Sequence, residues 1–337
     1  IKGQIGVYLH YLSWQHEAYK YAGKLVDDID IIHHRTWGSL HGGSELWKFS
    51  KPLLWGPIGG GQIAPTALLR YFEGNLYLEL LRSLTTFLFW LFYPSAGNAA
   101  RKSFLVLASN RETRDRLHNI KTCNVLLHPD FSLENDFIPI QYPTRTANSK
   151  LRILWVGRVY PRKGLNLVLN TLARVNIPFE LSVVGDGPWS NKVTKWVSDN
   201  KLDGKVICYG QLPWIDLKKL YIDHDIFLYT SLRETFGMQL LEAMAFGLPI
   251  ITLDCFGARD FIPDDAGFRI KVTTLDEIIN NLADAVERLW KDPKLRIKMG
   301  KAAHQFALGC TWEKTVTQYE QIYNHLIAKE NLVIVKK

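Results

Sequence analysis

The sequence predicts an α/β protein with two lobes, each built around a parallel sheet. Strand-like apolar runs alternate with helical segments in the second half of the chain, which is the rhythm of a parallel sheet. The chain has 337 residues, and single cores stop growing at roughly 250–300 residues. Residues 131–150 lose periodicity and gain prolines and polar residues, so we interpret them as the linker between the lobes.

The second lobe is predicted from five strand candidates. Leu151–Gly157 (L-R-I-L-W-V-G) is apolar apart from Arg152, as expected for a strand buried on both faces. An amphipathic helix follows, with apolar residues at i, i+3, i+4 and i+7 from Leu165. The other candidates are Phe179–Val184, Lys205–Tyr209, Asp225–Thr230 and Pro249–Asp254. Ligands of such sheets bind beyond the carboxyl ends of the strands, and the motifs of this lobe lie there.

The first lobe has shorter strand candidates. They are Asp30–His33, Pro52–Trp55, Phe104–Ala108 and Val125–His128. A long helix with apolar positions at helical spacing is predicted over Thr311–Ala328. We therefore expect a first lobe over residues 1–130, a linker over 131–150, a second lobe over 151–310 and a terminal helical segment over 311–337.

Residues 234–242 read E-T-F-G-M-Q-L-L-E and place two carboxylates eight positions apart. Met238–Phe246 are helix formers with glycine and proline just beyond, so Glu234 is predicted in a loop and Glu242 about two turns into a helix. The backbone N–H groups of residues 235–238 then lie at the positive end of that helix, where they bind phosphate oxygens. The carboxylates are left free to hold hydroxyl groups.

A basic turn, Arg158–Gly164 (R-V-Y-P-R-K-G), follows the first strand of the second lobe. Arg158 offers a planar guanidinium fork and Lys163 a compact point charge, so together they can neutralise a diphosphate. An arginine and a lysine at this spacing are also compatible with two solvated loop cations. Their position at a strand end, ahead of the glutamate motif, favours the phosphate site.

The stretch R-E-T-F-G-M-Q-L-L-E-A-M-A-F-G-L-P-I-I (residues 233–251) resembles the E-x7-E signature of retaining glycosyltransferases of family 4. That family has the GT-B fold of two Rossmann-like lobes, and the resemblance covers most of residues 151–328. It implies that Glu234 contacts the hydroxyls of the donor sugar and Glu242 the ribose of the nucleotide. It also implies that Arg158 and Lys163 contact the donor diphosphate.

Further donor-binding residues follow from the same resemblance. They lie at the strand-end turns and before the motif helix: Gly157, Gly185, Gly210, Thr235, Phe236, Gly237 and Met238. The turn V-G-D-G-P resembles a conserved turn of the family, although by itself it is only a tight glycine-rich turn. The family holds the nucleobase near residues 209–212 mostly through backbone contacts, so the base is not determined by the sequence.

The first lobe departs from the family pattern. Relatives open with a strand and a glycine-rich loop, and no counterpart precedes Gln4, so we expect the start of this lobe to be missing. Many relatives carry a histidine near the reacting sugar where this chain has G-P-I-G-G-G (residues 56–61). Two interpretations of Gly59, Gly60 and Gly61 remain open: a backbone wall that a substrate approaches closely, or a structural turn.

His33 and His34 follow a strand candidate, so at least one is expected on the cleft side of the first lobe. Histidine acts as an acid or base near neutral pH, which makes both candidates for the acceptor side. The alternative is a hydrogen-bonded histidine beside a buried strand. The same alternative holds for His128.

Composition narrows the setting. The sequence has no C-x-x-C or H-E-x-x-H pattern, so we expect a metal-independent reaction and no cofactor besides a UDP-, GDP- or ADP-sugar substrate. Four scattered cysteines fit a reducing cytoplasm. A net charge of +8 favours acidic partners, but no nucleic-acid-binding module is recognised.

Leu84–Tyr93 is the most apolar stretch of the chain. It is too short to cross a bilayer, which takes about 20 residues. Basic residues flank it (Arg70, Arg82, Arg101 and Lys102), as expected for a segment that rests on an anionic membrane surface. The alternative is a helix buried between lobes or in an oligomer.

These observations predict a retaining glycosyltransferase that moves a hexose-type sugar from a nucleotide-diphosphate sugar to an acceptor hydroxyl. The acceptor is expected to be a saccharide or a lipid-linked molecule in glycan, polysaccharide or glycolipid biosynthesis. Two alternatives remain: a truncated or inactive sugar-nucleotide-binding protein, and another GT-B enzyme such as a sugar-nucleotide epimerase or a phosphorylase.

Overall fold

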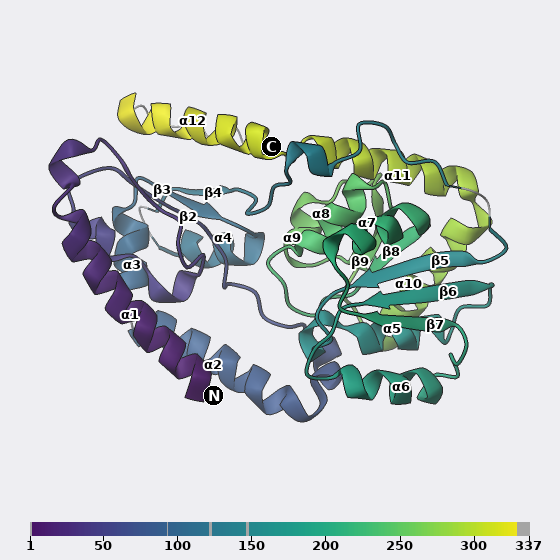
Figure 1. Cartoon of the computed structure of the whole chain (residues 1–337). Helices are drawn as coiled ribbons and strands as arrows, with labels where there is room; N and C mark the ends of the chain where they lie inside the picture. The colour runs from purple at the N-terminus through teal and green to yellow at the C-terminus, as the bar shows by residue number, and fades with distance from the viewer. Residues whose placement is uncertain (1, 93, 121–122, 146–147, 329–337) are drawn as a thin grey trace. The chain divides into compact units, whose positions relative to one another are not determined.

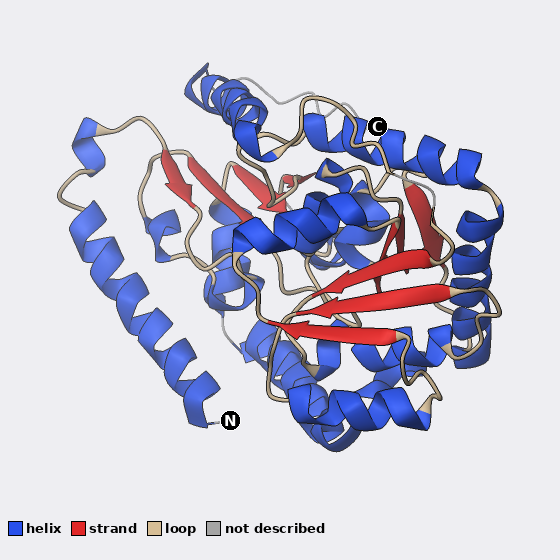
Figure 2. Ribbon diagram, turned by 45° about the vertical axis from the view of Figure 1, so that its right-hand side comes forward, coloured by secondary structure: helices blue, strands red, loops and turns tan. Residues whose placement is uncertain are grey.

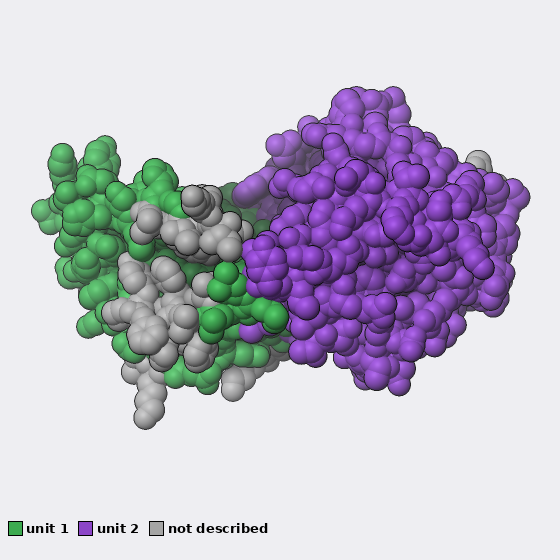
Figure 3. Space-filling view, turned by 90° about the horizontal axis from the view of Figure 1, so that it is seen from below, with its two compact units in different colours: residues 1–62, 80–130, 315–337 green, residues 63–79, 131–314 purple. Residues whose placement is uncertain are grey.

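The structure of the protein, a computed structural model, describes residues 2–92, 94–120, 123–145 and 148–328. The chain forms two compact units, coloured separately in Figure 3. Unit 1 comprises residues 1–62, 80–130 and 315–337, and unit 2 comprises residues 63–79 and 131–314. Each unit contains a parallel sheet, so the predicted α/β fold class is confirmed (Figures 1 and 2).

Unit 2 contains a six-stranded parallel sheet in the order β10-β9-β8-β5-β6-β7. Its strands are β5 (Leu151–Val156), β6 (Phe179–Val184), β7 (Val206–Gly210), β8 (Ile226–Tyr229), β9 (Ile250–Leu253) and β10 (Gly267–Ile270). Its helices are α5 (Leu165–Leu172), α6 (Ser190–Asp199), α7 (Trp214–Asp223), α8 (Met238–Ala245), α9 (Phe256–Phe261), α10 (Leu275–Lys291) and α11 (Pro293–Leu308). The five predicted strands are confirmed, and β10 was not predicted.

The direction of the strand order reverses between β5 and β8. The chain runs outward from β5 to β7 on one side of the sheet and from β8 to β10 on the other. Such a switch point leaves a crevice at the carboxyl ends of the two central strands, where ligands of α/β sheets bind. The loops that follow β5 and β8 therefore form the natural binding position in this unit.

Strand β5 is apolar at every position except Arg152, and its surroundings explain this pattern. Ile153 and Trp155 point into one hydrophobic core, which also contains side chains of α5 and α10. Leu154 and Val156 point into a second core on the other face of the sheet, together with side chains of α8. Because alternate residues of a strand face opposite sides, a strand covered on both faces is apolar at nearly every position, and Arg152, the exception, pairs with Asp225.

Unit 1 contains a four-stranded parallel sheet in the order β1-β2-β3-β4. Its strands are β1 (Ile32–His34), β2 (Leu53–Ile58), β3 (Leu105–Ala108) and β4 (Val125–Leu127). The helices in this part of the chain are α1 (Lys2–Ala22), α2 (Leu76–Phe92), α3 (Pro94–Lys102), α4 (Arg111–His118) and α12 (Trp312–Ala328). The four strand candidates are confirmed, whereas α1 was not predicted.

The terminal helix α12 packs on one face of the unit 1 sheet. Its Tyr319, Ile322 and Leu326 form a hydrophobic core with residues of β2 and β3, among them Leu54 and Leu107. Alternate residues of the same strands face a separate core on the other side of the sheet. Both faces of this sheet are therefore covered, as in unit 2.

Residues 63–79 differ from their expected position in the first lobe. Leu68, Tyr71 and Phe72 are buried in the core of unit 2, where Leu165 and Trp189 also lie. The Tyr71 hydroxyl donates a hydrogen bond to Asn170 Oδ1 at 2.9 Å. This segment has the sequence of an ordinary 3-10 turn region, and only its long-range partners reveal which core it joins.

Residues 131–150, expected to be a linker, are packed rather than free at several points. Arg145 is the clearest case, because its guanidinium donates to backbone carbonyls at the ends of two helices. Nη2 lies 3.2 Å from the carbonyl oxygen of Tyr221 in α7 and 2.6 Å from that of Phe246, just after α8. Nε also donates to the carbonyl of His224. The last carbonyls of a helix lack helical partners and carry partial negative charge, so one arginine caps both helices.

We predict that Arg145→Ala lowers the free energy of unfolding of unit 2 by about 3 kcal/mol, since several buried carbonyls lose a charged donor. Chemical denaturation followed by tryptophan fluorescence measures this change. The matched control is Arg174→Ala, which removes a surface pair with Asp276 and should cost less than about 1 kcal/mol. Equal losses in the two variants would contradict the capping role.

Candidate functional site

Two loops at the switch point of unit 2 carry the candidate site. The first follows β5 and contains Arg158 and, in a 3-10 turn over Pro161–Lys163, Lys163. The second follows β8 and contains Glu234, and helix α8, which begins after it, carries Glu242. The loops that carry Arg158, Lys163 and Glu234 therefore follow the two central strands at the same edge of the sheet, and α8, which carries Glu242, begins after the second loop.

Close backbone contacts join the two loops. Gly164 has a φ of 70°, and a Cβ there would lie 2.1 Å from the carbonyl oxygen of Thr230, so only glycine fits. Thr230 Oγ1 donates to the Gly164 carbonyl at 2.9 Å, and Ser231 Oγ donates to the Arg162 carbonyl at 3.0 Å. The first loop is thus held against the second, which brings Lys163 to Glu234.

The Lys163 ammonium forms an ion pair with the Glu234 carboxylate, and both side chains are largely buried. The Tyr229 hydroxyl completes the network: it accepts a hydrogen bond from Lys163 Nζ at 2.9 Å and lies 3.4 Å from Glu234 Oε2. Arg162 adds a second cation, with Nη1 3.5 Å from Glu234 Oε2. One carboxylate therefore faces two cations and one phenol.

Burial and charge set the ionisation of this pair. Burial by itself raises the pKa of the Glu234 carboxyl, but the charges of Lys163 and Arg162 outweigh it and hold that pKa below its ordinary value. Burial lowers the pKa of the Lys163 ammonium, although Glu234 opposes this effect. A buried lysine beside a carboxylate at a strand end is a candidate for binding an anion, because the anion can replace the carboxylate as its partner.

Glu242 has a separate partner. Its carboxylate accepts a hydrogen bond from the hydroxyl of Tyr221, a fully buried residue of α7, at 2.8 Å. Burial raises the pKa of Glu242, and this hydrogen bond opposes the rise. Each glutamate of the motif is therefore oriented by a buried tyrosine.

The N-terminus of α8 lies between the two glutamates. Its cap residue is Gly237, with a φ of 98° and no side-chain cap hydrogen bond. An N-terminus without a side-chain cap keeps backbone N–H groups for another acceptor, such as a phosphate. Phe236 points away from it into the core, where its ring stacks on Phe131 with 3.9 Å between centroids.

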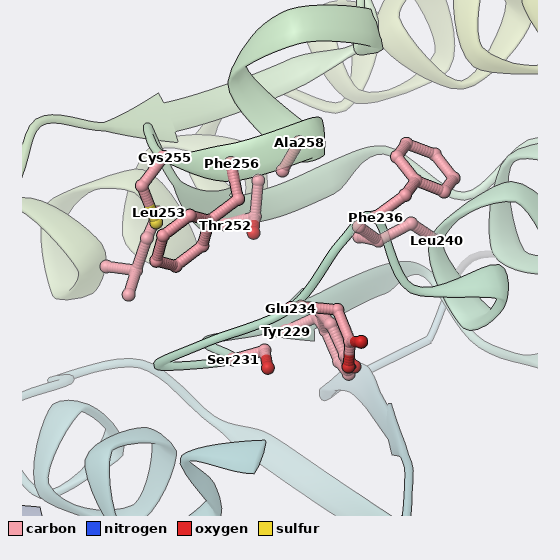
Figure 4. A pocket seen from close by; sticks show the side chains of 10 residues that line it. All are labelled: Tyr229, Ser231, Glu234, Phe236, Leu240, Thr252, Leu253, Cys255, Phe256 and Ala258. Carbon is pink, nitrogen blue, oxygen red and sulfur yellow. The ribbon is translucent and has the colours of Figure 1, made fainter. Parts of the chain in front are cut away.

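A small pocket of about 10 Å³, roughly the space of one water molecule, lies beside Glu234. Figure 4 shows Tyr229 and Glu234 side by side, with Phe236 and Leu240 along another part of the lining. The remaining lining comes from Ser231, from β9 (Thr252 and Leu253), from Cys255 and from α9 (Phe256 and Ala258). The pocket lining is therefore largely apolar, and its polar groups are the Glu234 carboxylate and the hydroxyls of Tyr229, Ser231 and Thr252.

The predicted strand-end glycines permit close packing of neighbouring turns. Gly185 has a φ of 124°, and a Cβ there would lie 2.0 Å from the carbonyl oxygen of Gly157. Gly210 has a φ of 66° and open space where a Cβ would be. Arg158 is exposed just after Gly157. Their contacts with a donor stay predictions, as do those of Thr235 and Met238.

The predicted acceptor-side residues all lie in unit 1. Both ring nitrogens of His33 have partners, the Tyr323 hydroxyl and the Gly56 carbonyl, each at 2.7 Å. His34 is buried with Nδ1 2.5 Å from Ser44 Oγ. These contacts match the alternative of hydrogen-bonded histidines beside a strand.

The three glycines after β2 lie close to other segments of unit 1. A Cβ on Gly60 would lie 2.9 Å from the ring of His41, and one on Gly61 would lie 2.5 Å from the backbone nitrogen of Thr113. Gly59 is joined to Ser39 by an isolated bridge. His41 was missed by sequence reasoning, because its approach to Gly60 is a long-range contact without a local signal.

Three residues of the donor-side network were also missed: Arg162, Tyr221 and Tyr229. Arg162 lies in the basic turn that was recognised, so its charge was a usable signal. The tyrosines lie within α7 and β8, where an aromatic residue is ordinary core material. Among the described residues, no group of three or more His, Cys, Asp or Glu side chains is placed to hold a metal ion.

Within the ranges that the structure describes, no helix has both the length and the apolar character needed to cross a membrane. The apolar stretch Leu84–Tyr93 falls at the end of α2. Leu84 is exposed, while the side chains of residues 85–92 and the whole of residue 93 lie outside the described part.

The chain was compared with known protein families. Residues 140–306 match the model of the glycosyl transferases group 1. This group 1 segment contains β5 to β9 and both loops of the candidate site.

Two curated relatives are similar to this chain in sequence. The N-acetyl-alpha-D-glucosaminyl L-malate synthase of Bacillus anthracis is 31% identical over 245 residues, which cover 68% of this chain and 63% of that protein. The phosphatidylinositol N-acetylglucosaminyltransferase GPI3 subunit of Saccharomyces cerevisiae is 26% identical over 166 residues, 47% of this chain. The match spans about a third (36%) of that yeast protein's length.

Solved structures resemble the fold over most of the chain. The sucrose-phosphate synthase of Thermosynechococcus elongatus gives a TM-score of 0.71 at 21% identity, covering 96% of this chain and 80% of that one. HepE of Anabaena in complex with UDP gives 0.65 at 17% identity, covering 92% and 81%. The two-lobed GT-B architecture is therefore confirmed at the level of the fold.

Buried histidines in unit 1 predict a loss of stability in mild acid. Burial lowers the pKa of His34 and of His41 to about 4, against 6.5 when exposed. Between pH 4 and pH 6.5 these histidines bind protons in the unfolded chain but not in the folded one. The neutral histidines therefore contribute fully to the free energy of unfolding above pH 6.5, and this contribution is lost as the pH falls to about 4. We expect losses of roughly 3 kcal/mol per histidine.

Chemical denaturation between pH 7 and 4 measures the slope of the free energy of unfolding against pH. The double variant His34→Gln and His41→Gln should flatten it. The control His118→Gln replaces an exposed histidine of α4 and should leave the pH dependence unchanged. A slope that stays the same in the double variant would rule out this assignment.

Proposed function

We propose that this chain is a retaining glycosyltransferase that moves a sugar from a nucleotide-diphosphate donor to an acceptor hydroxyl. The observation that carries the proposal is the buried network of Lys163, Glu234 and Tyr229 at the switch point of the unit 2 sheet. It joins a cation suited to phosphate and a carboxylate suited to sugar hydroxyls at one position. The match of residues 140–306 to the glycosyl transferases group 1 supports it.

In this proposal Arg158 and Lys163 bind the donor diphosphate, together with N–H groups at the start of α8. Their positive charge stabilises the diphosphate as it leaves, so no metal is required for that role. Glu234 holds sugar hydroxyls, and Glu242, oriented by Tyr221, holds the ribose. We favour UDP as the nucleotide, because HepE, whose fold this chain shares, is in complex with UDP; GDP and ADP are the alternatives.

Retention follows if the acceptor hydroxyl attacks from the face on which the diphosphate departs. The proposed groups all act on the donor, by holding the leaving group and the sugar in one orientation. Catalysis then comes mainly from positioning and charge stabilisation. The Gly59–Gly61 turn and the nearby histidines of unit 1 remain candidates for the acceptor side.

We propose a saccharide or a lipid-linked acceptor, in line with the phosphatidylinositol named for the yeast relative. A peripheral membrane contact through α2, on the cytoplasmic side, suits a lipid-linked acceptor. Tyr77, Leu80, Leu81 and Leu84 are exposed at helical spacing on this helix. Co-sedimentation with anionic vesicles should fall in Leu80→Gln with Leu84→Gln, and unchanged binding would count against the contact.

Substitutions in the network should separate binding from transfer. Glu242→Ala should weaken UDP binding by about 10- to 100-fold, because a charged hydrogen-bond acceptor is lost. Lys163→Ala should reduce the transfer rate by roughly 100-fold or more, well beyond its effect on donor affinity. Titration calorimetry with UDP and initial rates of transfer from UDP-sugars measure the two effects.

The control is Lys195→Ala, which removes a surface lysine of α6 paired with Asp199. It should leave affinity and rate unchanged. Wild-type UDP affinity in Glu242→Ala, together with a normal rate in Lys163→Ala, would show that the site is assigned wrongly. Binding of UDP without transfer to any acceptor would favour the sugar-nucleotide-binding alternative.

A further inference from the structure

We propose that Tyr229 is a positioning residue of the donor site, whose hydroxyl keeps the Lys163 ammonium in place when Glu234 turns to the sugar. This inference deepens the proposed function and rests on it. Tyr229 is the last residue of β8, and it is only 1% exposed. Its hydroxyl contacts both members of the Lys163–Glu234 ion pair.

The hydroxyl contacts both partners at once. It accepts a hydrogen bond from Lys163 Nζ at 2.9 Å and donates toward Glu234 Oε2 at 3.4 Å. A phenol has one proton to donate and lone pairs to accept, so both contacts are chemically compatible. The Lys163 ammonium therefore has two acceptors: a charged carboxylate and a neutral phenol.

These two acceptors behave differently when a donor binds. Glu234 must give up part of its interaction with Lys163 if it accepts hydrogen bonds from sugar hydroxyls. Tyr229 is fixed by the sheet and by burial, so its oxygen stays beside the ammonium. Burial also raises the pKa of Tyr229 well above its ordinary value, so the phenol stays neutral throughout the working pH range.

The position of the ring is fixed from a second side. A Cβ on Gly237 would lie 3.2 Å from both the hydroxyl oxygen and Cε1 of Tyr229. The phenol thus packs against the residue that caps α8, where the donor diphosphate is proposed to bind. Tyr229 links the basic turn, the Glu234 loop and the start of α8, which explains why a polar aromatic side chain ends a strand that is otherwise apolar.

The ammonium should lose protons more easily without the phenol. Burial already disfavours the charged form of Lys163, and a hydrogen bond to the charged form favours it. Tyr229→Phe keeps the ring and removes only the hydroxyl. We expect the basic limb of the pH profile of kcat/KM to shift to lower pH by about one unit, and kcat to fall about tenfold at neutral pH.

Tyr221→Phe is the matched control. It also removes one buried hydroxyl that contacts a glutamate of the motif, in this case Glu242. It should weaken UDP binding and leave the basic limb where it is. A shift of the limb in Tyr229→Phe alone supports the inference, whereas an unmoved limb in that variant, or equal shifts in both variants, overturns it.

Two further measurements keep the test decisive. If no UDP-, GDP- or ADP-sugar is turned over, the proposed function fails, and the pH dependence of UDP affinity replaces kcat/KM as the readout. If Tyr229→Phe does not fold, 3-fluorotyrosine placed at position 229 retains the hydroxyl. The chemical shift of its fluorine should then change over the same pH range as the basic limb of kcat/KM. A chemical shift that does not change over that range overturns the inference.

Discussion

The buried ion pair between Lys163 and Glu234 is the interaction on which the candidate site depends. Removing two charges from water is costly, and removing one partner of such a pair typically costs about 3–5 kcal/mol. The fold therefore has to hold both groups at one point with further contacts: a hydrogen bond from Lys163 to Tyr229 and an ion pair between Arg162 and Glu234. This cost fits the proposed role of the cation and the carboxylate in binding a ligand.

The surrounding architecture brings these groups together. The switch in strand order between β5 and β8 brings two loops together, and Gly164 allows them to touch. Arg145 caps the C-terminal ends of α7 and α8, the helices that carry Tyr221 and Glu242, and so stabilises the helices that hold this hydrogen-bonded pair. Sheet topology, Gly164 and Arg145 thus all help to position the charged side chains of the candidate site.

Much of this could be predicted from local sequence and part of it could not. The apolar run of β5, its basic turn and the two glutamates are local patterns, so the second lobe and its charged residues were predicted. Tyr229 looks like core material, and residues 63–79 join a core whose other members are far along the chain. Such contacts depend on tertiary packing, which a single sequence does not display, and His33 has the bonded role that its sequence left open.

The central claim is that the Lys163 ammonium exchanges a carboxylate for a diphosphate. Titration calorimetry of UDP and of a UDP-sugar with the unsubstituted chain and with Glu234→Gln tests it most directly. The account predicts that Glu234→Gln binds UDP at least as tightly, because the ammonium is no longer shared, and loses the added affinity contributed by the sugar. Loss of UDP binding in Glu234→Gln, with the protein still folded, would contradict the account.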